Sequence, residues 1–209
     1  MPLPTLHLVL AQETAALAGI SLSGRFLLGN LAPDAIHMRP GADRQDKNRT
    51  HLRVPDWNAS MERSRQLIAE HGEDPFLAGC ALHILADAMW LAGPWKRFRQ
   101  TLPEDIPEAE WRALYYRDTD ALDRYLFRQT AVHQLWSAAL AAKPSDYADL
   151  VTAAEIDAWR KDRYAALQQS RRIETAKYIT VGIMQDFIAE ASQRLAREYA
   201  RARASQEKA

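Results

Sequence analysis

The sequence predicts an all-α protein, and three observations favour that class. Apolar residues recur at the helical spacings of three and four along most of the chain. Alternating β-branched runs around an Asn-Gly or Asp-Gly turn, which are typical of hairpins, do not occur in it. Proline and glycine end several of the periodic stretches, as they do at helix ends. We therefore expect residues 1–209 to form a single domain, a bundle of several helices.

The first half of the chain is expected to contain four helices and one long loop. Pro33 and Gly72 mark the ends of the second and third helices, and Asp74 with Pro75 forms a typical start for the fourth. Residues 38–55 are polar and rich in turn residues, so we expect a long loop there, of the kind that often carries function. The four expected helices cover about residues 5–18, 24–31, 56–71 and 75–93.

The second half is expected to be helical throughout. Pro103 and Pro107 separate its first two helices, because proline interrupts a helix interior. The last helix carries isoleucines and a phenylalanine at helical spacing, and its charged end, about residues 190–209, is expected to be exposed. The expected helices cover about residues 95–100, 108–129, 130–142, 147–169 and 171–204.

Composition excludes some classes of protein. Lysine plus arginine and aspartate plus glutamate both total 27, and this balance argues against a general nucleic-acid binder. The single cysteine, Cys80, cannot form an intramolecular disulfide, which suits a reducing compartment. The first residues lack the basic segment of a signal peptide, and we expect no apolar window long enough for a transmembrane helix. We therefore expect a cytoplasmic protein, in which an oligomer is possible.

His83 and Asp87 form the most informative pair in the chain. They lie four residues apart in the apolar stretch from Phe76 to Trp90, so both side chains share one helix face. Burying an unpaired carboxylate is costly, and Asp87 therefore needs a cation, hydrogen-bond donors or a metal. The pair is interpreted either as a hydrogen-bonded pair inside the core or as two ligands of a metal ion.

Three further residues upstream suit a metal site. His7 has leucine on both sides, Asp34 follows Pro33, and His51 ends the polar segment. Each also has an ordinary explanation: a core histidine, a turn aspartate and a surface histidine, respectively. Taken together with the downstream pair, they supply the imidazoles and carboxylates that zinc prefers.

Basic residues in the expected loop are candidates for binding a phosphate group. Lys47, Arg49 and also Arg39 carry donors suited to phosphate oxygens. For each of them, a solvated loop charge is the alternative interpretation. His37, in the same region, is a further candidate for contacting substrate.

The residues that form this series resemble the bacterial zinc-dependent phospholipase C family. The resemblance covers about the first 95 residues, and that family is all α and related to the zinc-dependent single-strand nucleases. It implies that one ion is held by four residues and that His7 serves a neighbouring ion, with Asp87 able to bridge the two. The segments that carry it are His7, Leu28 to Asp34, Lys47-x-x-Thr50-His51 and Phe76 to His83-x-x-x-Asp87. The four residues implied for the first ion are Asp34, His51, His83 and Asp87.

The chain departs from the family in two places. It begins Met-Pro, whereas the mature amino-terminal residue of the family is a tryptophan that ligates metal. The downstream His-x-x-x-Glu element that completes a third metal site is missing. We therefore expect one or two ions, zinc as the first choice, with manganese or iron also compatible with the ligand types.

The expected function is metal-dependent hydrolysis of a phosphoric ester, either a phosphodiester or a phosphomonoester, through a metal-bound water. Asp34 and Asp87 are the candidate catalytic residues, because a carboxylate beside the ion can accept a proton from the attacking water. The expected partner is a small phosphate-containing substrate. A helical phosphohydrolase of the His-Asp type is disfavoured, because the chain has no adjacent His-Asp pair. The remaining alternative is a non-catalytic helical interaction protein whose metal site is structural or vestigial.

Overall fold

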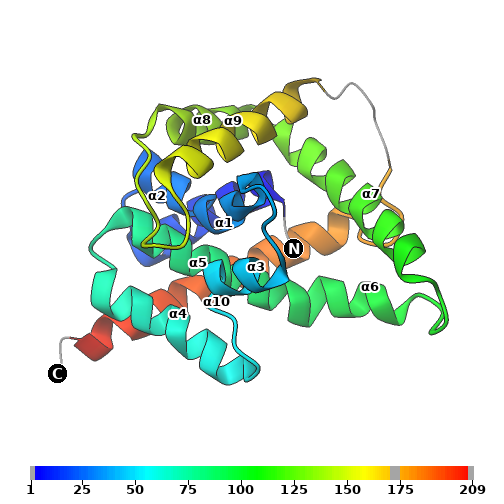
Figure 1. Ribbon diagram of the computed structural model, residues 1–209, viewed down its shortest axis with the longest axis horizontal. Coiled ribbons are helices and arrows are strands. Elements are labelled where there is room, and N and C mark those ends of the chain that lie inside the picture. The colour runs from blue at the N-terminus through cyan, green and yellow to red at the C-terminus, as the bar shows by residue number, and fades with distance from the viewer. Residues whose placement is uncertain (1–2, 170–174, 207–209) are drawn as a thin grey trace.

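The computed structural model describes residues 3–169 and 175–206, and the elements that these residues form are helical (Figure 1). The only extended pairing among them is an isolated bridge between Tyr147 and Val151. The expected all-α class is therefore confirmed. The α-helices are α1 (Pro4–Ala18), α2 (Gly24–Gly29), α3 (Arg44–Thr50), α4 (Trp57–His71), α5 (Pro75–Trp90), α6 (Lys96–Gln100), α7 (Glu108–Phe127), α8 (Thr130–Ala141), α9 (Ala153–Gln169) and α10 (Val181–Gln206), with a 3-10 helix η1 (Ala32–Met38) and a π-helical turn η2 (Leu91–Trp95).

Helix α5 is the centre of the molecule. Nearly every one of its side chains is buried, and it packs on α1, α2, α4 and α10. Asp74 begins the helix as expected, since its side chain accepts a hydrogen bond from the Phe76 amide, 2.8 Å away. Figure 1 shows α8 and α9 on one side of α1 and α5, and α4 with α10 on the other. The pair His83 and Asp87 is thereby placed in the middle of the bundle.

Two glycines allow α2 to cross α5 at very short range. A Cβ atom on Gly79 would overlap the carbonyl oxygen of Phe26, and one on Gly29 would overlap the carbonyl oxygen of Phe76. Both overlaps involve backbone atoms, which cannot rotate away. The close crossing brings Asn30, the residue that follows α2, against α5.

The expected loop over residues 38–55 is wrong in its central part, which forms α3. This short helix has no apolar face, so periodicity gives no sign of it. Its start is instead fixed by a capping box, in which Asp43 accepts from the backbone of Asp46 and Asp46 accepts from the backbone of Asp43. The helix ends at His51, and Leu52 follows with a φ of 52°, in the left-handed region.

The segment after α5 stays helical instead of stopping at Pro94. The π-helical turn η2 contains Pro94 and leads directly into α6. The continuous helical segment Pro75–Gln100 is therefore long and apolar enough to cross a membrane, judged by length and composition. The expectation that no apolar window reaches this length is wrong. However, 78% of its most apolar window is buried inside the protein, as is typical of the central helix of a bundle.

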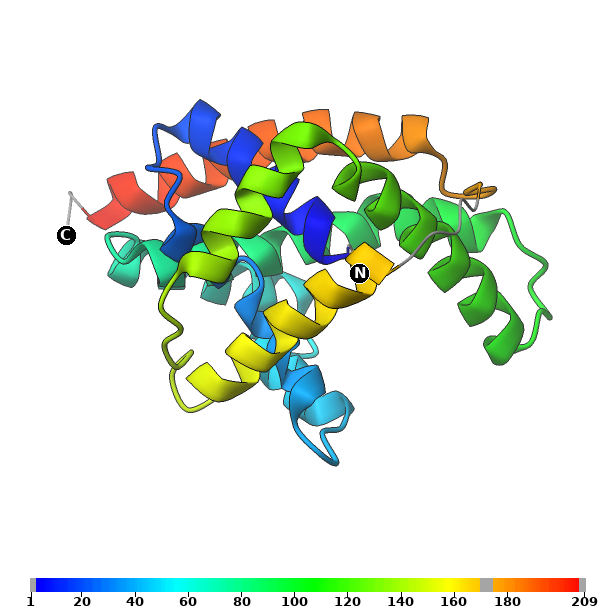
Figure 2. The same cartoon turned by 90° about the horizontal axis from the view of Figure 1, so that it is seen from above.

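Of the C-terminal helices, α10 packs directly against α5 (Figure 2). Helix α10 runs beside α1 and α4. Its charged end is only partly exposed, because Leu195 and Ala202 are buried and Glu198 pairs with Arg65 of α4. Helices α9 and α10 begin later than expected, at Ala153 and Val181, and residues 170–174, where the last helix was expected to begin, lie outside the described residues.

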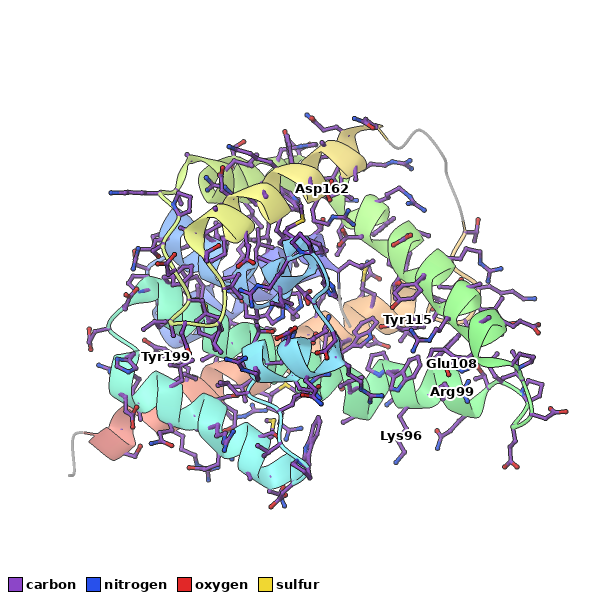
Figure 3. All side chains as sticks on the ribbon, viewed as in Figure 1. Lys96, Arg99, Glu108, Tyr115, Asp162 and Tyr199 are labelled. Atoms are coloured by element: carbon purple, nitrogen blue, oxygen red, sulfur yellow. The ribbon has the colours of Figure 1, made fainter. Side chains whose placement is uncertain are left out.

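Helices α6 and α7 project from one side of the bundle and share an aromatic cluster. In Figure 3, Tyr115 lies between them, whereas Lys96 points outward. The Tyr115 hydroxyl accepts a hydrogen bond from Trp90 Nε1, 2.9 Å away, and its ring lies against Trp95 and Phe98. These contacts fasten the projecting pair of helices to the end of α5.

Candidate metal centre

The structure brings all five candidate ligands together, although they come from four different elements. His7 lies on α1, Asp34 on η1, His51 at the end of α3, and His83 with Asp87 on α5. Each of them is at most 5% exposed. Within this cluster, one group of three possible ligands consists of His7, His83 and Asp87, and another of Asp34, His51 and His83. In each group the ligand atoms lie within 4.8 Å of one another.

The backbone fixes how His83 and His51 face each other. Nδ1 of His83 lies 2.8 Å from the carbonyl oxygen of Asn30, and Nδ1 of His51 lies 2.9 Å from that of Lys47. A carbonyl oxygen only accepts, so the neutral tautomer that donates to its carbonyl has the hydrogen on Nδ1 and the lone pair on Nε2; Nδ1 of His51 also lies 2.9 Å from the Thr50 hydroxyl. The two Nε2 atoms are 3.3 Å apart. Two lone pairs at this distance repel each other unless a proton or a metal cation lies between them.

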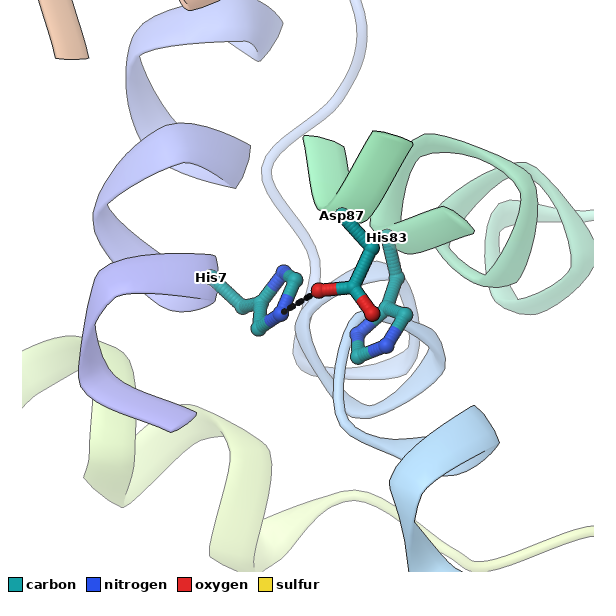
Figure 4. Close-up of side chains that lie close together, drawn as sticks. All are labelled: His7, His83 and Asp87. Carbon is teal, nitrogen blue, oxygen red and sulfur yellow. Dashed lines mark ion pairs between the residues drawn. The ribbon is translucent and has the colours of Figure 1, made fainter. Parts of the chain in front are cut away.

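His7 completes the cluster from the side of α1. Its ring stacks on that of His83 with centroids 3.8 Å apart, and its Nε2 lies 3.6 Å from Oδ1 of Asp87 (Figure 4). Among the described residues, neither ring nitrogen of His7 nor Oδ1 of Asp87 has a hydrogen-bond partner. Buried polar atoms normally have one, so these three atoms are suited to ligating a cation.

The two carboxylates approach the same imidazole. Nε2 of His51 lies 3.4 Å from Oδ1 of Asp34 and 3.5 Å from Oδ2 of Asp87. Burial by itself would raise the pKa of Asp34, but the Lys47 ammonium and the neighbouring histidines hold it well below its usual range. Burial likewise opposes ionisation of Asp87, and its interactions with His7 and His83 prevail and lower its pKa. Both groups are therefore carboxylates at neutral pH.

His83 stays neutral over the physiological range. Burial, followed by the neighbouring His7, lowers the pKa of His83 to about 3. A neutral imidazole is the form that ligates a metal. The cluster therefore already has the protonation states that metal binding requires at these three residues, Asp34, His83 and Asp87.

The basic candidates of the expected loop occupy different places. Lys47 Nζ lies 3.0 Å from Oδ1 of Asp34 and 2.8 Å from Nε2 of the half-exposed His37. Arg49 is 61% exposed, and its side chain lies near Asp46 on the same helix. Arg39 forms a two-pronged ion pair with Glu155 of α9 and donates to the Leu150 carbonyl, and none of these partners belongs to the cluster.

Two contributors to the site have no signal in the sequence. Nη2 of Arg53 lies 3.3 Å from Oδ2 of Asp87, and Arg53 follows Leu52, whose φ of 52° is in the left-handed region. The carbonyl of Asn30 orients His83, yet a backbone group can come from any residue type. Both contributions become visible only in the folded structure, where α2 crosses α5 and the chain turns after His51.

Comparisons with known proteins returned no match: no family model, no curated protein and no solved structure is significantly similar to this chain.

Proposed function

We propose that this protein is a metal-dependent hydrolase of a phosphoric ester, with a helical architecture of the zinc-dependent phospholipase C type. The observation that carries the proposal is the approach of the Nε2 atoms of His51 and His83, 3.3 Å apart, beside oxygens of Asp34 and Asp87. Buried nitrogen and oxygen donors of this kind suit zinc first, and manganese or iron next. The resemblance of the series His7, Asp34, His51 and His83-x-x-x-Asp87 to the ligands of that family motivates the same proposal, although no family model matches the chain.

The donors divide into a primary set and an additional one. Asp34, His51, His83 and Asp87 would hold the first ion. His83 has only Nε2 to offer, because its Nδ1 faces a carbonyl, so it can ligate only one ion. A second ion would therefore depend on His7 and Asp87. When bound, a divalent cation lowers the pKa of a coordinated water and polarises a phosphoryl oxygen.

The chain's own residues would supply proton transfer and orientation. Asp34 and Asp87 are carboxylates at neutral pH, and a carboxylate oxygen that is not ligating the ion can accept a proton from the attacking water. Lys47 and His37 lie at the more exposed edge of the cluster, where they would contact the phosphate oxygens of a small substrate. Arg49 has no contact with the cluster among the described residues, and its role stays a prediction.

The test is metal analysis of purified protein together with turnover of nitrophenyl phosphomonoesters and phosphodiesters, with and without added zinc. We expect His83→Ala and Asp87→Ala each to lose bound metal and to lower turnover by about a hundredfold or more. His71→Ala, at a half-exposed histidine outside the cluster, is the matched control and should change neither.

Full metal occupancy in both cluster variants would refute the proposed site. Bound metal in the wild-type protein without turnover of any ester would instead support the alternative, a helical interaction protein with a structural metal.

A further inference from the structure

Each carboxylate of the cluster is matched with one cation from the same short segment of chain. Lys47 Nζ lies 3.0 Å from Oδ1 of Asp34, and Arg53 NH2 lies 3.3 Å from Oδ2 of Asp87. The carboxylate side chains are 7% and 1% exposed, whereas the two basic side chains are 17% and 30% exposed. The two basic side chains are therefore more accessible to solvent than the carboxylates with which they pair.

We infer that Lys47 and Arg53 form a latent anion site, which becomes available to a phosphate group only after a divalent cation has taken over Asp34 and Asp87. This inference rests on the proposed function and deepens it. Without the metal ion, the carboxylates compete with phosphate for the same two cations. With the ion in place, the carboxylate oxygens are engaged by the metal, and the lysine and arginine can turn their donors toward an anion.

The balance of charge indicates which phosphate group fits. Two carboxylates and two basic side chains neutralise each other, and histidines that ligate a metal are neutral. A single divalent cation then leaves the site with an excess of two positive charges. A phosphomonoester dianion restores neutrality, whereas a phosphodiester carries only one negative charge. The site therefore favours the terminal phosphate of a monoester, or inorganic phosphate itself.

The geometry of Arg53 suits this double role. A guanidinium has five N–H donors in a planar fork, so it can keep contact with Asp87 and bind a phosphate oxygen at the same time. Its position depends on Leu52, whose positive φ is rare for a leucine and turns the chain after α3. Strained backbone of this type is often kept at functional sites.

The experiment is calorimetric titration of the whole protein with zinc alone, with inorganic phosphate alone, and with phosphate after zinc. We expect wild-type protein to bind phosphate only after zinc. Arg53→Gln and Lys47→Gln should each weaken phosphate binding to the zinc-loaded protein by about tenfold or more, because each removes a charge-assisted contact. Their zinc affinity should stay equal or rise, since a competing cation has been removed.

Arg44→Gln is the matched control. It makes the same charge change at an exposed position on the same helix as Lys47, and should leave both affinities unchanged. Arg53→Lys, which keeps the charge, should retain more phosphate affinity than Arg53→Gln. Dimethyl phosphate, a monoanion, should bind the zinc-loaded protein more weakly than inorganic phosphate does.

The possible failures are distinguishable. Zinc binding by the wild-type protein together with equal phosphate binding in the presence and absence of zinc overturns the coupling and leaves the metal site standing. Weaker zinc binding in Arg53→Gln with unchanged phosphate affinity shows Arg53 to be a clamp for Asp87, which also overturns the inference. A wild-type protein that binds no zinc overturns the proposed function itself, and this inference with it.

Discussion

His7 is the residue whose surroundings are hardest to explain by stability alone. Both of its ring nitrogens are buried without a hydrogen-bond partner among the described residues, whereas His51 and His83 each use one nitrogen to contact a carbonyl oxygen. A buried polar group left unsatisfied costs about 1–3 kcal/mol. A cation that draws on the lone pair of His7 would offset this cost.

We predict that replacing His7 with leucine changes the stability of the metal-free protein little, because the gain of about 1–3 kcal/mol from removing unsatisfied nitrogens is offset by loss of the His7 contact that lowers the pKa of the Asp87 carboxylate. The same change should reduce the gain in thermal stability that zinc produces. Thermal unfolding of both proteins in chelator and in zinc measures the two effects. A gain in thermal stability from zinc that is equal in the two proteins would show that His7 takes no part in binding the metal.

Helical spacing in the sequence can predict proximity only for ligands that lie on the same helix. The four-residue interval between His83 and Asp87 predicted their common face, and the structure confirms that both lie in the buried cluster. His7, Asp34 and His51 were placed by their residue types and by the family resemblance, not by a spacing. Their convergence depends on how α1, η1 and α3 pack, which no local pattern encodes.

The crossing of α2 and α5 is the element-scale feature on which the site depends. The two glycines at the contact let the backbones approach, and this approach carries the Asn30 carbonyl to Nδ1 of His83. A side chain at the crossing would push the helices apart and release His83 from its fixed orientation. Packing of helix backbones is therefore coupled directly to the direction in which a ligand points.

We predict that Gly79→Ala lowers the free energy of unfolding by about 1–3 kcal/mol, because its Cβ atom overlaps the carbonyl oxygen of Phe26. It should also weaken zinc binding. Gly182→Ala, at an exposed position in the first turn of α10, is the control: its Cβ atom meets nothing closer than 3.8 Å, and stability should stay within about 0.5 kcal/mol of wild type. Chemical denaturation measures both. Equal stability of Gly79→Ala and wild type would contradict the role given to the crossing.

At the scale of the whole molecule, aspartates of α7 fasten distant segments of the chain. Asp123 accepts hydrogen bonds from the backbone amides of Thr5 and Leu6, 2.9 and 3.3 Å away, and so caps the start of α1. Asp118 accepts hydrogen bonds from the backbone amides of residues 177–179, in the segment just before α10. The helix that carries His7 is thus held at its start by a residue more than a hundred positions later.

Burial of Asp123 predicts a pH dependence of global stability. Burial raises its pKa from near 3.8 to about 7, against the hydrogen bonds from Thr5 and Leu6. Between these values the folded protein holds a proton that the unfolded chain has lost, so this group makes stability fall as pH rises from about 4 to about 7. Asp123→Asn cannot titrate, and its stability relative to wild type should therefore be higher at pH 8 than at pH 5.

Denaturant titrations of both proteins at the two pH values measure this difference. The lowered pKa values of Asp34, Asp87 and His83 act in the opposite direction, removing stability as pH falls, and they are common to both proteins. A stability difference that does not change with pH would show that Asp123 is ionised throughout.

The sequence by itself determined the helical class, most of the helix positions and the shared face of His83 and Asp87, because these follow from periodicity, caps and spacing along one element. It did not determine α3, whose seven residues have no apolar face and depend on the Asp43–Asp46 capping box. The tertiary structure alone decided that five donors from α1, η1, α3 and α5 meet, and that Arg53 joins them. The reason is physical: these contacts join residues far apart in the chain, 32 positions for His51–His83 and 34 for Arg53–Asp87, and they form only when apolar faces pack.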